Sequence, residues 1–327
     1  MNRRRIRRLF FINFIVSLFA VQSSLAAENV RVAYPSMNSS VFGIIIAEKE
    51  GYLKEEGLDV QLLSIRGEIA IRTPLAGEID FFTNAGSALA AAVRSVPVKI
   101  LTVFQDKPGW DLIAEPGIKS IAQLRGKTIG VMSPEGSLAV VAREILRKNG
   151  MDPAKDVNLV VMGGDEVRFP ALQTKSIQAT LFNSAMSIKA QKDGFTKLAA
   201  SSDYANLIEG GIAAADVKVK QNPEKMFRFI RATLKGLDYF LSKREPAIKY
   251  MTEALRLKDR DLANSIYDVQ SKLLLRDGYT DDKVLQSMIE AMKKTTKVQR
   301  DIKVSDIFDL AFVKKASDEI KASGWKP

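Results

Sequence analysis

The stretch KTIGVMSPEGSLAVVAREILRKNGMDPAKDVNLVVM, residues 127–162, contains two short apolar runs separated by a loop and a helical pattern. Each run is rich in β-branched residues, which favours a buried strand. The apolar residues between the runs recur at helical spacing and predict a helix over 137–149 with one buried stripe, formed by Leu138, Val141, Ala142, Ile145 and Leu146. A strand–helix–strand unit of this kind is typical of a mostly parallel sheet covered by helices.

The same alternation runs through most of the chain. Strands are predicted at 30–34, 58–65, 79–84 and 98–105, and a second series at 127–132, 157–162, 178–183 and 196–201, while long helices are predicted at 223–242, 259–276 and 280–295. We therefore expect an α/β fold of two βα lobes, joined by strand-like linkers near 111–115 and 208–214, with a helical C-terminal tail. Lobe 1 would comprise 27–113 plus 208–327, and lobe 2 would comprise 114–207.

The first 26 residues have the pattern of an export signal. Five arginines precede an apolar stretch over 9–21, and small residues surround Leu25 just before the expected cleavage site at Ala26. No later stretch approaches the roughly 20 apolar residues that span a bilayer, so we expect a soluble periplasmic protein after cleavage. The RRLFF sequence leaves the choice between the Sec and twin-arginine routes open.

Composition excludes several classes of chemistry. The chain has no Cys and no His, which excludes disulfides, thiolate nucleophiles, Ser-His triads and the usual zinc ligands, so no metal, cofactor or catalytic residue is expected. The formal net charge is +11, and removal of a signal with five arginines and no acidic residue would leave +6. Lys and Glu are interleaved without a basic block beside aromatic residues, so nucleic acid is not an expected partner.

Small polar loops follow the ends of four predicted strands, and each one opens a helix. They are YPSMNSS (34–40), TNAGS (83–87), SPEGS (133–137) and FNSAM (182–186). Loops that follow strands in an open α/β sheet face the ligand crevice, and helix N-termini offer free N–H donors. The candidate ligand contacts are therefore Asn38, Ser39, Ser40, Asn84, Gly86, Ser87, Ser133, Gly136, Ser137 and Asn183. Ordinary turn formation and helix capping explain the same residue types, and both interpretations stay open.

Five segments resemble those of a known protein family and follow one another in the same order as in that family. They are AEKEGYLKEEGLDVQLLS (47–64), TPLAGEIDFFTNAGSALAAAVRSVPVKIL (73–101), IKSIAQLRGKTIGV (118–131), REILRKNGMDPAKDVNLV (143–160) and NPEKMFRFIRATLKGLDYF (222–240). Together they resemble the periplasmic solute-binding proteins of ABC importers for alkanesulfonates, taurine, nitrate and thiamine-pyrimidine precursors.

The resemblance implies a type II periplasmic-binding-protein fold with a ligand cleft between the lobes. It further implies a monomer that closes on a small organic or anionic solute and delivers it to a permease with its ATPase in the inner membrane, without catalysing a reaction. This chain departs from the family pattern at two positions of the second lobe, where Lys175 and Gln178 replace the glycine and aspartate that relatives commonly have. In the first lobe, Pro74 interrupts a helical pattern. The resemblance therefore implies no one substrate of the family for this chain.

Two larger side chains are further candidates for the ligand site. Arg168 can hold a sulfonate or carboxylate through two parallel hydrogen bonds, and Trp110 can form an aromatic wall. The alternatives are a solvated arginine on the first turn of a helix and a tryptophan that packs at the lobe junction. Glu135 would repel an anion if it pointed into the cleft.

Two other functions share this fold. A thiamine-pyrimidine synthase is disfavoured, because that family is expected to use histidine chemistry and this chain has no His. A sensor subunit that binds a similar ligand but docks onto a signalling receptor is not separated from a transport subunit by the sequence.

Overall fold

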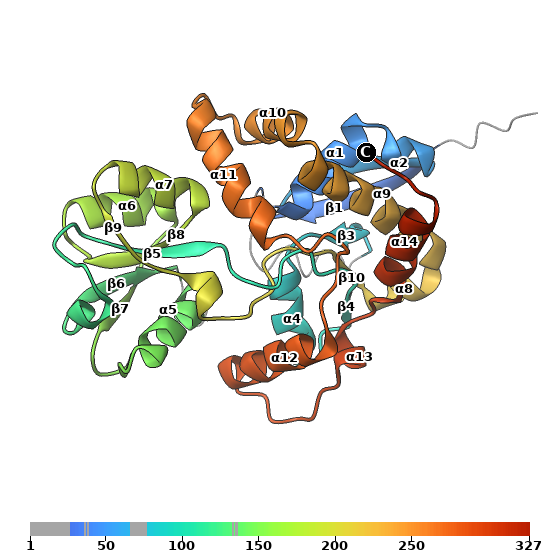
Figure 1. The fold of residues 1–327 in the computed structure, drawn as a ribbon. Helices are drawn as coiled ribbons and strands as arrows, with labels where there is room; N and C mark the ends of the chain where they lie inside the picture. The colour runs from blue at the N-terminus through green and yellow to red at the C-terminus, as the bar shows by residue number, and fades with distance from the viewer. Residues whose placement is uncertain (1–26, 36, 38, 66–76, 133, 135–136) are drawn as a thin grey trace, which may run out of the picture.

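The computed structural model describes residues 27–35, 37, 39–65, 77–132, 134 and 137–327. Within these ranges the strands form two five-stranded sheets, one at the centre of each half of the molecule (Figure 1). In sheet order, the first sheet consists of β2 (Leu58–Ser64), β1 (Glu28–Tyr34), β3 (Phe81–Phe82), β10 (Ala213–Ala215) and β4 (Val98–Ile100). The predicted α/β fold is confirmed.

The second sheet has the order β7 (Asn158–Val161), β6 (Thr128–Val131), β8 (Ala179–Asn183), β5 (Trp110–Ala114) and β9 (Thr196–Ala200). Each sheet has one strand inserted antiparallel to its two neighbours, β10 in the first and β5 in the second. Residues 111–114 are therefore not a linker, as the sequence predicted, but part of a strand paired on both sides, and β5 spans the boundary predicted at 113/114. The chain crosses between the sheets before Trp110 and again before Ala213.

Helices cover both faces of each sheet. The second sheet carries α5 (Ser137–Lys148), α6 (Asp165–Gln173) and α7 (Ser184–Lys192), with short 3₁₀ turns η1 (Ile121–Leu124) and η2 (Ser201–Asp203). The first sheet carries α1 (Ser39–Lys49), α2 (Tyr52–Glu55), α4 (Ala85–Val93), α8 (Asp216–Gln221), α9 (Pro223–Ser242), α10 (Arg244–Leu255), α11 (Arg260–Leu273), α12 (Asp282–Thr296), α13 (Val304–Ile307) and α14 (Ala311–Ala322). No helix in the described ranges combines the length and apolar character needed to cross a bilayer.

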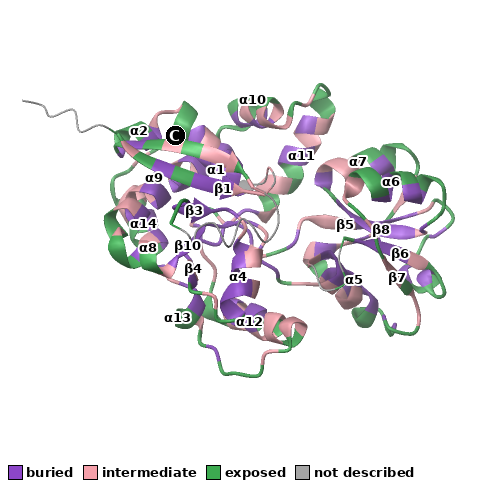
Figure 2. Ribbon diagram, turned by 180° about the vertical axis from the view of Figure 1, so that it is seen from behind, coloured by how far each residue is buried: buried purple, intermediate pink, exposed green. Residues whose placement is uncertain are grey.

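The strands separate distinct apolar cores (Figure 2). One large core surrounds the first sheet, and two smaller cores lie on opposite faces of the second. Leu112 and Ile113 show the alternation, because these successive residues of β5 enter the two different small cores. All five residues of the predicted stripe on α5 are buried in the core that contains Leu112.

The two substitutions in the second lobe preserve the local geometry. Lys175 has a left-handed φ of 59°, the conformation that glycine adopts at Gly77 in the equivalent turn. Gln178 accepts a hydrogen bond from the Thr128 backbone N–H at 3.0 Å, as Asp80 does from Arg31 at 3.0 Å in the first sheet. The departures therefore lie in turns that connect helices to strands. Pro74 lies outside the described residues.

Helices α1 and α9 cross in close contact at two glycines. A Cβ atom added at Gly236 would lie 2.0 Å from the carbonyl oxygen of Gly43, and one at Gly43 would lie 3.4 Å from the carbonyl oxygen of Thr233. The small residues let the two backbones approach, so the N-terminal helix packs directly on the first long helix of the C-terminal tail.

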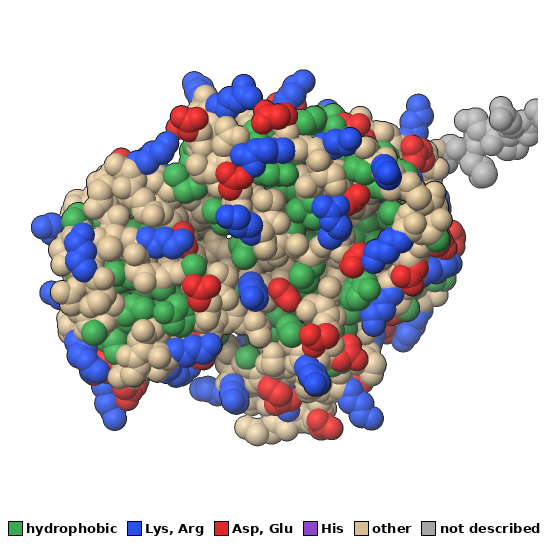
Figure 3. Space-filling view, in the orientation of Figure 1, with side chains coloured by type: hydrophobic (Ala, Val, Ile, Leu, Met, Phe, Trp, Pro, Cys, Tyr) green, Lys and Arg blue, Asp and Glu red, His purple; other side chains and the backbone are tan. Residues whose placement is uncertain are grey.

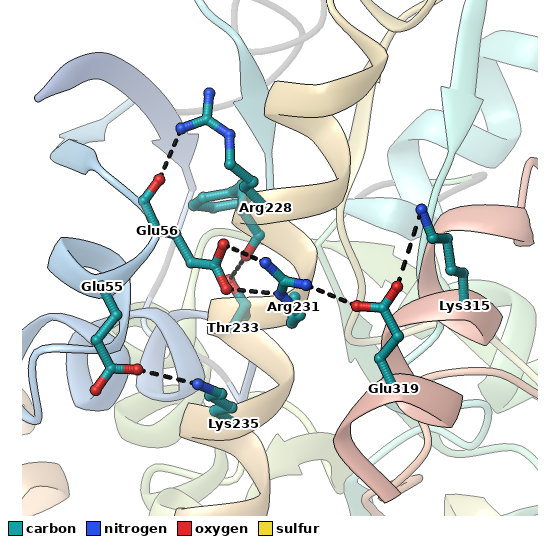
Figure 4. Close-up of polar contacts among 9 residues, drawn as sticks. Glu55, Glu56, Arg228, Arg231, Thr233, Lys235, Lys315 and Glu319 are labelled. Carbon is teal, nitrogen blue, oxygen red and sulfur yellow. Dashed lines mark hydrogen bonds and ion pairs between the residues drawn. The ribbon is translucent and has the colours of Figure 1, made fainter. Parts of the chain in front are cut away.

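An ion network joins three helical segments around α9 (Figure 4). Arg231 holds both carboxylate oxygens of Glu56, at 2.6 and 2.7 Å, and also contacts Glu319 of α14 at 2.6 Å. The hydrogen bonds to Glu56, and to a smaller extent the one to Glu319, raise the pKa of Arg231. Lys235 pairs with Glu55 at 3.0 Å on the same side. The bidentate geometry fixes α2 and α14 against α9 more firmly than single surface pairs would. On the face in Figure 3, other Lys and Arg side chains are likewise interspersed with Asp and Glu.

We predict that Gly236→Ala lowers the free energy of unfolding by about 3 kcal/mol, because the new methyl group must push α1 and α9 apart. Urea unfolding of the purified protein measures the change. Gly117→Ala is the matched control, since a Cβ at Gly117 would have no atom within 4 Å. Equal midpoints for the two variants would contradict the close crossing.

Candidate ligand-binding site

The carboxyl ends of the parallel strands define one edge of each sheet. In the first sheet β1 leads into α1, β3 leads into α4, and β4 leads into the crossing at 101–109. In the second sheet β6, β7 and β8 lead into α5, α6 and α7, and Trp110 at the start of β5 pairs with Asn183 at the end of β8. Open α/β sheets bind ligands at such edges.

The two crossings leave the sheets at these edges and are hydrogen-bonded to each other. Phe104 N–H donates to the carbonyl of Gly210 at 2.9 Å, Glu209 N–H donates to Gln105 at 3.1 Å, and Leu207 N–H donates to Asp106 at 3.0 Å. The edges therefore face the same pair of crossing segments, which Figure 1 shows between the two halves.

At the edge of the first sheet, the candidate residues contact helix starts and a crossing. Asn84 caps α4 by accepting a hydrogen bond from the backbone N–H of Ser87 at 3.1 Å. Ser40 is fully buried, and its hydroxyl accepts a hydrogen bond from Gly211 N–H at 2.8 Å. A Cβ at Gly86 would lie 2.7 Å from the carbonyl oxygen of Ile208. The structure thus brings Ser40 and Gly86 to the crossing at 208–211, with Asn84 and Ser87 on the same helix start as Gly86, and the contact of all four with a ligand stays a prediction.

At the edge of the second sheet, Asn183 has two partners. Its side-chain oxygen caps α7 through Met186 N–H at 3.0 Å, and its amide nitrogen donates to Asp165 at 2.8 Å. Trp110 is half-buried, and its backbone N–H donates to the Ser201 hydroxyl at 2.9 Å. Trp110 also packs against the core beside α5, which agrees with the junction-packing alternative without testing an aromatic wall.

Arg168 is buried and engaged within its own half of the molecule. Its side chain is 2% exposed, and its guanidinium donates to Thr180 Oγ1 at 3.1 Å, to the Leu181 carbonyl at 2.8 Å, and to Asp165. Burial raises the pKa of Asp165 and lowers that of Arg168. The solvated-arginine interpretation is therefore wrong. That Arg168 contacts a ligand stays a prediction, and none of these hydrogen bonds supports it.

The SPEGS loop is only partly within the described residues. Ser137 begins α5 and is half-buried, whereas Ser133, Glu135 and Gly136 lie outside the described residues. Asn38 also lies outside, and Ser39 is described only as the first helical residue of α1. The choice between ligand contact and capping at these positions stays open.

Three further polar groups lie at the edges. Thr83 and Ser184 belong to the predicted loops at 83–87 and 182–186, and only Glu209 was not identified from the sequence. The hydroxyls of Thr83 and Ser184 are buried at the ends of β3 and β8, and neither has a hydrogen-bond partner among the residues that the structure describes. Buried unpaired hydroxyls are uncommon and call for a specific explanation, such as a binding site. Glu209 lies on the second crossing, directly before two glycines. The one signal in the sequence that could have indicated Glu209 is LIEGGI (207–212), where a single acidic residue stands among apolar residues and glycines.

Two hollows among the described residues lie away from these edges, along α9 and α14. One, of about 280 Å³, is lined by Pro223, Glu224, Phe227, Ala311, Phe312 and Lys315. The other, of about 130 Å³, includes Asp238, Arg276 and Trp325 in its lining. A cleft between the two edges therefore stays a prediction from topology.

Known proteins share both the sequence pattern and the fold. A family model described as NMT1/THI5 like matches residues 38–247. A riboflavin-binding protein, RibY of Chloroflexus aurantiacus, is 26% identical over 287 residues, covering 82% of this chain and 81% of that protein. A 4-amino-5-hydroxymethyl-2-methylpyrimidine phosphate synthase of Saccharomyces cerevisiae is 24% identical over 243 residues, covering 68% of this chain and 70% of the synthase. The periplasmic aliphatic sulphonate binding protein SsuA of Escherichia coli superposes with a TM-score of 0.71 at 16% identity, covering 85% of this chain and 96% of SsuA.

We predict that Arg168→Met lowers the free energy of unfolding by about 3 kcal/mol, because it leaves the half-buried Asp165 carboxylate without its cation and Thr180 and Leu181 without their buried donor. Urea unfolding measures the loss, and the double variant Arg168→Met/Asp165→Asn should recover part of it. If Arg168→Met instead kept the parental midpoint and only weakened ligand binding, Arg168 would be a ligand contact.

Proposed function

Because the chain belongs to the NMT1/THI5-like family, we propose that it is the extracytoplasmic solute-binding subunit of an ABC importer. The observation that carries the proposal is the arrangement of two sheets whose carboxyl edges face one pair of hydrogen-bonded crossings. The periplasmic-binding-protein fold, shared with SsuA at a TM-score of 0.71, supports a solute-binding role.

The mechanism we propose is capture of a small solute between the two edges. The helix starts at α1, α4, α5 and α7 supply backbone N–H groups and side chains from both halves. Rotation about residues 101–109 and 201–212 would close the halves on the solute as a rigid-body hinge motion. The closed form would dock on a permease, whose ATPase drives import. The protein would reach the periplasm through the signal at residues 1–26.

Two ligand classes follow from the names of the relatives. One relative binds riboflavin and a structural neighbour binds aliphatic sulfonates, so a nitrogen heterocycle and a sulfonate-like anion are both candidates. Carboxylate and nitrate-like solutes remain within the second class.

We propose binding without catalysis. One relative is a synthase, so the family includes enzymes. The present chain has no His or Cys in its entire sequence, which removes the common general base and the thiolate nucleophile. Its other two relatives described above are binding proteins.

We predict that a true ligand both stabilises and compacts the protein. A ligand that binds only the folded state adds about 2.7 kcal/mol at a hundredfold excess over Kd. Thermal unfolding with riboflavin, 4-amino-5-hydroxymethyl-2-methylpyrimidine, taurine, ethanesulfonate, acetate and nitrate identifies it, and small-angle scattering at saturation should show a smaller radius of gyration. A stabilising ligand that leaves the radius unchanged would contradict hinge closure.

Export is testable separately. We predict that the full-length chain expressed in a Gram-negative host is cleaved near Ala26 and released by gentle disruption of the outer membrane, because residues 1–26 have the three regions of a signal. Intact-mass measurement of the released fraction gives the cleavage site. Retention of residues 1–26 would contradict the prediction.

A further inference from the structure

Helix α7 has apolar side chains on two nearly opposite faces. Met186 and Ala190 pack into the core on one face of the second sheet. Ala185 and Ile188 instead pack against the large core of the first half. Successive residues of an α-helix are turned by about 100° about its axis, which puts the two pairs on different sides of α7. One side of a second-half helix is therefore covered by the first half.

Helix α11 of the first half lies against α7 (Figure 1). Lys192, the last residue of α7, pairs with Asp259, the N-cap of α11, at 3.5 Å. Ala263 and Ile266 lie one and two turns further along the same side of α11 as Asp259, and both are buried in the large core. These side chains and the two that α7 turns to the first half form what we call the α7–α11 contact.

Each of the two helices is fixed to its own half by other contacts. The Ser187 hydroxyl of α7 donates to the carboxylate of Asp111 in β5 at 2.6 Å. The Tyr267 hydroxyl of α11 donates to the Phe240 carbonyl of α9 at 2.8 Å, inside the large core. The helices therefore move with their own halves, and any relative motion of the halves shifts α7 against α11.

The α7–α11 contact is apolar but small. On the α7 side, Ala185 and Ile188 are only half-buried. The ion pair between Lys192 and Asp259 is exposed on both sides and adds little. Parts of one chain move relative to each other unless the interface between them is large and apolar. A contact of this size favours one arrangement of the halves without locking it.

We propose that the α7–α11 contact holds the two halves in the arrangement of Figure 1 and opposes their closure on a solute. The inference rests on the proposed solute-binding function and adds to it a contact that regulates closure. Rotation about the two crossings must separate or repack α7 and α11, so part of the free energy of solute binding is used for that step. Weakening the contact therefore raises the affinity for the solute, although Ile188 does not touch the solute.

The arrangement of the halves is testable without any added compound. The chain has no Cys, so Lys155→Cys in the second half and Lys220→Cys in the first, both exposed, accept spin labels at these two positions alone. Electron double resonance then measures the distribution of the distance between the labels. Ile188→Asp should add a second distance to the distribution, because the α7–α11 contact cannot form without burying a carboxylate.

Val217→Asp is the matched control, because it makes the same apolar-to-acid change at an exposed position of α8. Its distance distribution should equal that of wild type. Ile188→Ala is the milder second variant and should shift the distribution in the same direction as Ile188→Asp. If both Ile188 variants gave the distribution of Val217→Asp, the proposed role of the α7–α11 contact would be overturned.

Affinity is the second test, by calorimetric titration with riboflavin, the aminopyrimidine of the panel, taurine and ethanesulfonate. A compound that binds wild type should bind Ile188→Ala about fivefold more tightly, because the variant loses most of a half-buried side chain from the contact that opposes closure. Leu198→Ala truncates a half-buried residue that packs within the second half, and it should bind as wild type does. Unchanged or weaker binding by Ile188→Ala would overturn the inference.

The outcomes separate this inference from the proposed function. Binding of a compound with equal affinity in wild type and Ile188→Ala would leave a solute-binding protein and overturn the role of the α7–α11 contact. Binding of no compound by wild type would count against the proposed function. The distance measurement, which uses no compound, would still decide whether the contact holds the halves in place.

Discussion

The hydrogen-bonded pair of crossings is the constraint on which the arrangement of the two halves depends. The second crossing returns into the first sheet as β10, between β3 and β4, and can do so because Gly211 has no side chain. A Cβ at Gly211 would lie 2.3 Å from the Thr102 carbonyl oxygen and 3.0 Å from Ala85. The same close approach fixes the neighbouring Glu209 beside the starts of α1 and α4. The loop after α11 supports the pair from the other side, since Leu275 N–H donates to Phe104 and Val103 N–H donates to Gly278.

The sequence was a good guide to the fold wherever a periodic pattern was long. Helices α5 and α9 begin at their predicted residues, because apolar residues recur at helical spacing over their whole length. Residues 111–115 were predicted as a strand-like linker, so their extended conformation was expected. Their place between β8 and β9 was not, because pairing with distant strands on both sides leaves no local pattern in the sequence. The substitution at Gln178 looked like a departure in function. In the structure an amide oxygen accepts the bond from Thr128 that a carboxylate accepts from Arg31 in the first sheet, so the turn is conserved in geometry.

The candidate site was less predictable, because capping and ligand binding use the same residue types. Asn84 and Asn183 cap helices, and Ser40 accepts a hydrogen bond from the second crossing. A short polar loop at a strand end has the same residue types whether it caps a helix or binds a ligand. Arg168 illustrates a different limit. Its partner Asp165 stands three residues earlier, a spacing visible in the sequence, but the burial that makes the pair structural depends on Thr180 and Leu181 of a distant strand.

Helix α11 connects the crossings to the second half and limits how the halves can move. It packs against α7, whose residues Ala185 and Ile188 join the large core of the first half (Figure 1). The end of the same helix approaches the first crossing, since a Cβ at Gly109 would lie 3.2 Å from the Leu273 side chain. The ion pair between Lys192 and Asp259 that accompanies the α7–α11 contact is exposed on both sides and contributes little. Any rotation about the crossings must therefore shift the apolar contact made by Ala185 and Ile188, which closely follow Asn183 at the edge of the second sheet. Because α11 touches both this edge and the first crossing, the closure proposed above would have to repack α11 at both places.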